Sequence, residues 1–216
     1  MKTVTKILVP VDFSETSKNA VRMAFEWSNL LKCEVTLLCA YRLIQNNEHG
    51  KALTARQIRE TIINRKHAQL EQLKSEIDFS IAHEVKSLFE LGFMPNCIER
   101  VVKEEKIDLI IYGLKPKSIP NTNVDLIRSL QDDHTPFLIV HGNYKTGHFG
   151  SIKDLETNIT SLGVSEFIEN FNHLLIDLER SPNTCFLVHP SEGQTKHSLE
   201  ERPSIVDRIV NFSKTN

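Results

Sequence analysis

Short apolar runs recur along the chain between residues 7 and 141, and most of them lack strict alternation of apolar and polar positions. This pattern is typical of strands that are covered on both faces of a sheet. It predicts five strands, numbered here in chain order, at residues 7–11, 34–41, 79–88, 108–112 and 136–141.

The segments between these runs carry apolar residues at spacings of three and four, which predicts helices with one buried face. The first such stripe consists of Ala20, Met23, Ala24, Trp27, Leu30 and Leu31. Ser14 is suited to cap this helix, and Glu15 suits the positive end of its dipole. Further helices are predicted at 52–77, at 95–106 after Gly92, and at 124–131. The basic side of the 52–77 helix would fit an anionic partner, although a solvated helix on a sheet is the simpler interpretation.

Strand and helix alternate throughout this part of the sequence, which predicts an α/β domain with a doubly wound parallel sheet at residues 1–143. Residues 144–216 form a C-terminal extension that opens with the linker-like stretch "YKTGHFGSIKD". The extension is expected to be helix-rich, with helices at 165–179 and 203–213 and a strand at 184–189. Its residues Phe167, Phe171 and Leu174 are expected to pack on the first domain, on a partner subunit, or in a core of their own.

The predicted strand of the extension and the residues before it resemble the end of the first domain. "LQDDHTPFLIVH" at 130–141 resembles "LERSPNTCFLVH" at 178–189. The echo is short enough to arise by chance; if it is real, it indicates the remains of a truncated second copy.

Composition narrows the class of protein. The chain has 216 residues, 40% of them hydrophobic and 25% charged, with a formal net charge of −2. This balance gives no reason to expect nucleic acid or a membrane surface as partner. No apolar run approaches the roughly 20 residues of a membrane span, and the N-terminus lacks a secretory apolar region. Four scattered cysteines without a C-x-x-C pair are typical of a reducing compartment, so the chain is expected to be cytoplasmic.

Two residues stand where an open parallel sheet binds its ligands, beyond the carboxyl ends of strands that flank the reversal of strand order. Asp12 follows the first strand and would accept a hydrogen bond from a base or ribose. Gly113 follows the fourth strand and would let backbone approach a ligand. Each residue alone is better explained as an ordinary turn residue.

Three segments resemble the universal stress protein family over residues 1–142. These are "KILVPVDFSETSKNAVRMAFEWSNLLKCEVTLLCAY", "LGFMPNCIERVVKEEKIDLIIYG" and "TPFLIVHG". The resemblance implies a Rossmann-like sheet of order 3-2-1-4-5, of the adenine nucleotide alpha hydrolase-like kind. It also implies a homodimer, often formed through the fifth strand.

The family's ATP-binding motif, G-2x-G-9x-G-[S/T], is incomplete here. In that motif successive backbone N–H groups wrap the phosphates. Gly113 fills the first position, but Pro116, which has no N–H, stands at the second. The closing pair is Leu126 and Ile127, or Asn123 and Val124 if the loop is shortened. The resemblance therefore predicts that the usual phosphate cradle is lost.

The base side of the same pocket is better preserved. Pro10, Asp12, Ala40 and Tyr112 match positions that line the base and ribose in ATP-binding members. Lys115 and Lys117 would supply charge in place of the missing amides, or simply be solvated lysines on a loop. No cofactor is expected, and ATP or another adenine nucleotide is the ligand that the retained positions would suit.

The sequence contains no H-x-x-x-H spacing, no G-x-S-x-G turn and no cysteine in a catalytic context, so it gives no case for an enzyme or a metal site. The resemblance implies a regulatory or stress-response protein that acts through dimerisation and an unidentified protein partner. The main alternative is a sensor that binds an adenine nucleotide through an altered loop. An enzyme acting on an adenylated substrate rests on fold analogy alone.

Overall fold

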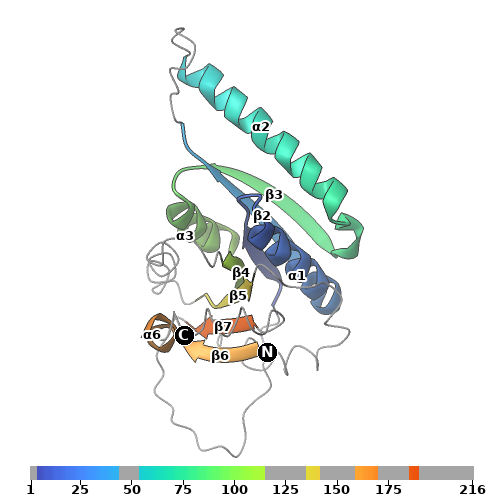
Figure 1. The fold of residues 1–216 in the computed structure, drawn as a ribbon, viewed down its shortest axis with the longest axis vertical. Coiled ribbons are helices and arrows are strands. Elements are labelled where there is room, and N and C mark those ends of the chain that lie inside the picture. The colour runs from blue at the N-terminus through green and yellow to red at the C-terminus, as the bar shows by residue number, and fades with distance from the viewer. Residues whose placement is uncertain (1–3, 44–53, 115–134, 142–158, 170–184, 190–216) are drawn as a thin grey trace, which may run out of the picture.

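The computed structural model describes residues 4–43, 54–114, 135–141, 159–169 and 185–189, which form one seven-stranded sheet flanked by helices (Figure 1). The strand order is β3-β2-β1-β4-β5-β7-β6. The predicted order 3-2-1-4-5 is confirmed, and two strands of the extension continue the same sheet beyond β5.

The first five strands pair in parallel. They are β1 (Lys6–Pro10), β2 (Glu34–Tyr41), β3 (Glu84–Leu91), β4 (Leu109–Leu114) and β5 (Phe137–His141). In the extension, β6 (Ile159–Gly163) pairs in parallel with β7 (Cys185–His189). β7 runs antiparallel to β5, so the sheet is mostly but not wholly parallel.

Two of the described helices begin at residues whose side chains cap the helix N-terminus. The described helices are α1 (Glu15–Leu31), α2 (Ala55–Glu76), α3 (Met94–Glu105) and the short α6 (Val164–Glu169). Ser14 caps α1 as predicted, because its side chain accepts from the Ser17 N–H. Thr54 and Gln57 form a reciprocal capping box at the start of α2.

Helices cover both faces of the sheet, as a doubly wound fold requires. We call the apolar layer between the sheet and α1 and α2 the first core, and the layer on the α3 and α6 face the second core. Successive strand residues alternate between them: Leu109 and Ile111 of β4 lie in the first core, and Ile110 in the second. In Figure 1 α1 and α2 lie on one face of the sheet and α3 on the other.

One buried hydroxyl connects α1 to two other segments in the first core. Ser28, fully buried in α1, donates from Oγ to the carbonyl oxygen of Cys33 at 2.6 Å. The same oxygen accepts the backbone N–H of His83, just before β3, at 3.0 Å. The hydroxyl thus pairs two backbone groups beside an apolar layer, where unpaired groups would be costly.

The extension packs on the first part of the chain through both cores. Cys185 and Leu187 of β7 belong to the first core, and the Cys185 Sγ lies 4.0 Å from the Sδ of Met23 in α1. Phe167 of α6, 1% exposed, belongs to the second core. Phe167 therefore packs on the first domain, whereas Phe171 and Leu174 lie outside the described residues.

Several predicted elements need correction. The third strand was predicted at 79–88, but Phe79–Ile81 forms a 3-10 turn (η1), because the Asp78 side chain accepts from the Ser80 N–H at 2.9 Å. The strand follows at Glu84–Leu91. The fourth strand does not end before Gly113 but runs through it to Leu114.

The extension departs from the prediction as well. β6 was not predicted, because Ile159–Gly163 carries only two large apolar residues in "ITSLG". The helix predicted at 165–179 is described only as α6, Val164–Glu169. The helices predicted at 124–131 and 203–213, and the domain boundary at residue 143, lie outside the described residues.

Candidate functional site

The carboxyl ends of β1, β2 and β4 lie side by side, and three of the predicted pocket residues share one face there. Pro10 pairs with Leu38 at the end of β1, two residues after Leu8 of the second core. Ala40 and Tyr112 pack against the same core from β2 and β4. The structure therefore brings together Pro10, Ala40 and Tyr112 on the α3 side of the sheet.

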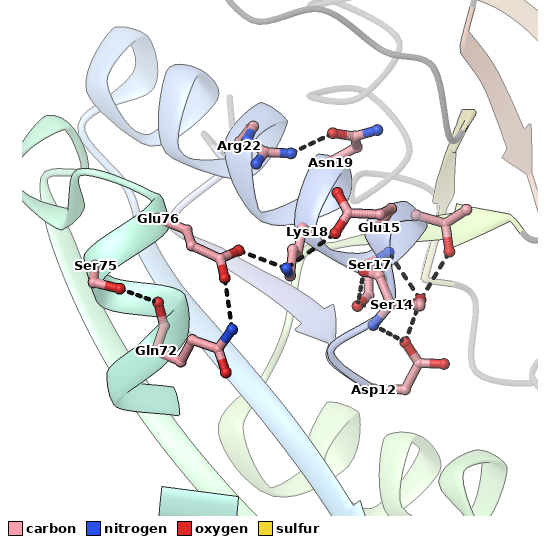
Figure 2. A network of polar contacts seen from close by, with 11 residues as sticks. Asp12, Ser14, Glu15, Ser17, Lys18, Asn19, Arg22, Gln72, Ser75 and Glu76 are labelled. Atoms are coloured by element: carbon pink, nitrogen blue, oxygen red, sulfur yellow. Dashed lines mark hydrogen bonds and ion pairs between the residues drawn. The ribbon is translucent and has the colours of Figure 1, made fainter. Parts of the chain in front are cut away.

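Asp12 forms a tight turn between β1 and α1. Its Oδ1 accepts the Ser14 N–H at 3.0 Å and also the Ser14 hydroxyl (Figure 2). The Ser14 Oγ lies 3.0 Å from the Thr16 Oγ1 and accepts the Ser17 N–H at 3.4 Å. Asp12 is exposed, but one of its oxygens already holds the turn that starts α1.

The residue inside this turn is strained. Phe13 has a φ of 65°, in the left-handed region, which is rare for a bulky side chain and costs about 1–3 kcal/mol. Its ring lies 4.9 Å from the Nζ of Lys66, a residue of α2. The strained turn directs the chain sharply from the end of β1 into α1.

A second contact joins the start of α1 to the end of α2 (Figure 2). The Lys18 Nζ lies 3.0 Å from Glu15 Oε1 and 2.5 Å from Glu76 Oε2. Glu76 also accepts from the Gln72 side-chain amide at 2.9 Å. These contacts with Lys18 and Gln72 lower the pKa of the Glu76 carboxyl.

Tyr112 and Asp12 influence each other electrostatically. Burial raises the pKa of the Tyr112 phenol to about 12, and the negative charge of Asp12 adds to the shift. The phenol is therefore protonated at neutral pH and is a potential hydrogen-bond donor at the edge of the site.

Gly113 faces the opposite side of the sheet from Tyr112. A Cβ at Gly113 would lie 2.2 Å from the carbonyl oxygen of Thr16 and 2.8 Å from the backbone nitrogen of Ser17. The backbone of β4 thus touches the first turn of α1, and only glycine allows this approach. The glycine is occupied by packing within the fold.

Two residues that meet beside the start of α3 were not among the predicted site residues. Phe93, 61% exposed, precedes α3 and provides no side-chain cap. The guanidinium of Arg42, which follows β2, lies 4.9 Å from the centre of the Phe93 ring. The available sequence signal was an aromatic residue directly before Met-Pro. Lys115, the last predicted site residue, lies outside the described residues.

Among the described residues, no group of three or more His, Cys, Asp or Glu side chains is placed to hold a metal ion. Within the same ranges, no helix is long and apolar enough to cross a membrane.

The fold agrees with the comparison to known families. A model of the universal stress protein family matches residues 3–120. Because the match spans more than half of the chain, the chain belongs to the universal stress protein family. A search of curated proteins gave no match.

Two solved structures of low sequence identity share the fold, and a third is reported beside them. UspA from Lactobacillus plantarum is 19% identical with a TM-score of 0.50, over 65% of this chain and 99% of that chain. A universal stress protein from Archaeoglobus fulgidus is 13% identical with a TM-score of 0.50, over 82% of this chain and 64% of that chain. Another universal stress protein, solved in complex with cAMP, is 16% identical with a TM-score of 0.49, over 66% of this chain and all of that chain.

Proposed function

We propose that this chain is a stress-response protein that works through protein contacts, without catalytic turnover and without the glycine-rich phosphate cradle of ATP-binding family members. Membership of the family supports the general role. The proposed lack of a phosphate cradle is argued from the residues at the carboxyl ends of β1 and β4.

The observation that carries the proposal is the position of Gly113. Its backbone lies against Thr16, where a Cβ would come within 2.2 Å of the carbonyl oxygen. The glycine that fills the first position of the sequence motif therefore serves the packing of β4 on α1. The next motif position is Pro116, which has no N–H to offer a phosphate oxygen.

The described thiols are poor nucleophiles, which supports a role without covalent catalysis. All four cysteines are buried and in the thiol form. Burial raises the pKa of Cys33 to about 11 and that of Cys39 and Cys185 to about 12, and it also raises the pKa of Cys97. Their thiolate forms are scarce at neutral pH.

A second candidate function is an adenine-nucleotide sensor. Pro10, Ala40 and Tyr112 lie together on one face, and Asp12 is close enough to raise the pKa of the Tyr112 phenol. An apolar face with a phenol donor and a carboxylate acceptor would suit a purine and its ribose. Lys115 would then supply charge for a phosphate.

The experiment that separates the two is nucleotide binding by the full chain. Small molecules released from freshly purified protein are identified by mass spectrometry, beside a thermal-shift titration with ATP, AMP and cAMP. We expect no bound nucleotide and no shift at millimolar concentration. A stoichiometric nucleotide, or a shift that Asp12→Ala removes, would refute the proposal in favour of the sensor.

The chain offers a matched control for Asp12→Ala. Asp78, Phe79 and Ser80 repeat the sequence of Asp12, Phe13 and Ser14, and the Asp78 Oδ1 likewise accepts the Ser80 N–H and hydroxyl, at 2.9 and 2.6 Å. This second turn precedes β3 and lies at the opposite ends of the strands. Asp78→Ala therefore reports the cost of losing such a turn without touching the candidate pocket.

The proposed partners are a second copy of this chain and an unidentified protein, and the proposed compartment is the cytoplasm. The homodimer that the resemblance implies often uses the fifth strand. In this chain β7 pairs with β5 on the side away from β4, so a second copy would need another surface.

A further inference from the structure

The pairing of β5 with β7 has an approximate twofold symmetry, which two strands of unrelated sequence need not show. Leu138 lies opposite Leu187, with Phe137 opposite Val188 and Ile139 opposite Phe186. If "TPFLI" at 135–139 is aligned with "TCFLV" at 184–188, each of these partners becomes the counterpart of a β5 residue. In this alignment Leu187 is the counterpart of Leu138, Phe186 that of Phe137 and Val188 that of Ile139. Phe137 thus pairs with the counterpart of Ile139, and Ile139 pairs with the counterpart of Phe137. This arrangement corresponds to a pseudo-twofold axis through the Leu138–Leu187 pair.

The neighbouring strands obey the same correspondence. Ile110 of β4 pairs with Phe137, and Gly113 pairs three residues further on with Val140. Thr160 of β6 pairs with Phe186, and Gly163 pairs three residues further on with His189. The glycines at the ends of "LIIYG" and "ITSLG" therefore occupy matching places, and both strand pairs are parallel.

The packing layers agree with this alignment. Phe137 and its counterpart Phe186 lie in the second core, whereas Leu138 and Leu187 lie in the first. Tyr112 and its counterpart Leu162 also share the second core. An alignment shifted by one residue, as in the echo that ends on His141 and His189, would place counterparts on opposite faces of the sheet.

From these registers we propose that β6–α6–β7 is a half-copy of the first domain that takes the place of a second subunit along the outer edge of β5. The surface is that edge, and the partner it fits is the β5 of another copy of this chain. In the intact protein the edge is closed from within, so two copies do not pair along it.

The rest of a second copy is missing. The segment between β5 and β6, residues 142–158, is too short to hold counterparts of β1, β2, β3 and the helices between them. The two glycines differ in the described structure: a Cβ at Gly163 would meet no described atom within 4 Å, whereas a Cβ at Gly113 would strike the first turn of α1. The described part of the half-copy keeps the two strands that continue the β5 edge and contains no counterpart of α1.

Closing this edge has a physical benefit. An unpaired strand of the sequence "FLIVH" would present backbone N–H and C=O groups beside large apolar side chains, which invites pairing with other chains. β7 satisfies those groups and adds Cys185, Phe186, Leu187 and Val188 to the two cores.

The first test uses the full chain and one substitution. Continuing the register by one residue places Val140 opposite Cys185, and both residues are buried in the first core. Val140→Cys should therefore form a disulfide with Cys185 on oxidation with copper phenanthroline, within one chain and at the mass of one chain. The matched control Ile139→Cys faces the second core and should form none. A disulfide between two chains, or none in Val140→Cys, would overturn the proposal.

The second test opens the edge in the full chain. Leu187→Pro removes an N–H from the middle of β7, which a paired strand does not tolerate. The pseudo-twofold then predicts that two copies pair along β5 with Leu138 opposite Leu138. Leu138→Cys combined with Leu187→Pro should yield a covalent dimer of twice the 24.7 kDa chain.

Two controls make this result specific. Leu138→Cys in the otherwise intact chain should stay uncrosslinked, and so should Ile139→Cys combined with Leu187→Pro. A folded Leu138→Cys/Leu187→Pro chain that remains uncrosslinked, or equal crosslinking in the intact chain, would contradict the proposal. The Val140→Cys test is independent of how well the Leu187→Pro chain folds.

Discussion

Gly113→Ala tests directly whether the glycine at the candidate site is needed for packing. The added methyl would lie 2.2 Å from the Thr16 carbonyl oxygen, 2.4 Å from its carbon and 2.8 Å from the Ser17 nitrogen. All three atoms belong to backbone in the first turn of α1, so no side-chain rotation relieves the clash. Either α1 or β4 must shift, and overpacking of this kind costs about 3 kcal/mol. For a chain of this size that corresponds to a loss of roughly 6–12 °C in melting temperature.

The matched control is Gly163→Ala, at the corresponding place in β6, where the methyl would meet none of the atoms that the structure describes within 4 Å. Because alanine is less flexible than glycine when unfolded, this variant should be unchanged or more stable by up to about 1 kcal/mol. Both variants are measured by thermal and urea unfolding in parallel. Equal losses in the two variants, or an unchanged Gly113→Ala, would refute the close contact between β4 and α1. If instead Gly113→Ala keeps its stability and gains or loses nucleotide affinity, the glycine belongs to a ligand site.

Two further predictions concern contacts that join helices to the sheet. Ser28→Ala removes a buried hydroxyl that pairs two backbone groups, and it should lower the free energy of unfolding in urea by about 2–3 kcal/mol. The control Ser75→Ala, at an exposed serine, should lower it by less than about 0.5 kcal/mol. Similar losses in the two variants would contradict the buried pairing. The pKa of Glu76 is lowered by Lys18, so its contribution to stability is present above its ordinary pKa of 4.5 and disappears as the pH falls through the lower value of the folded state. Glu76→Gln should therefore be less stable than the parent chain at pH 7 and converge with it in acid, and a difference that is independent of pH would contradict the assignment.

Much of the first domain was predictable because its strands are buried on both faces. β2 was predicted with its observed bounds, and β1 and β5 within one residue at each end, since their apolar runs end at polar or turn residues. β3 was placed too early: Asp78 and Ser80 form a turn whose chemistry is local, but the apolar residues around it suggested a strand.

The candidate site was predictable in part. Asp12 and Ser14 form a turn between neighbours in sequence, and the periodic apolar residues that follow it indicated that a helix starts there. The same three letters at 78–80 precede a 3-10 turn and a strand, so "DFS" alone does not predict a helix. The role of Gly113 was not predictable in the same way, because the atoms that exclude a side chain there come from Thr16 and Ser17, far away in the sequence. The charge of Asp12 acts on Tyr112 across a similar separation.

The sequence alone determined the βα alternation, the order in which buried strands occur and the family to which the first domain belongs, because these depend on local periodicity and short motifs. Only the tertiary structure decided that the extension continues the sheet and that β7 runs antiparallel to β5. Strand direction and register depend on backbone hydrogen bonds between distant segments, and β6 has too few apolar residues to be recognised before its partner is in place. The same distant pairing decides which edge of the sheet remains open.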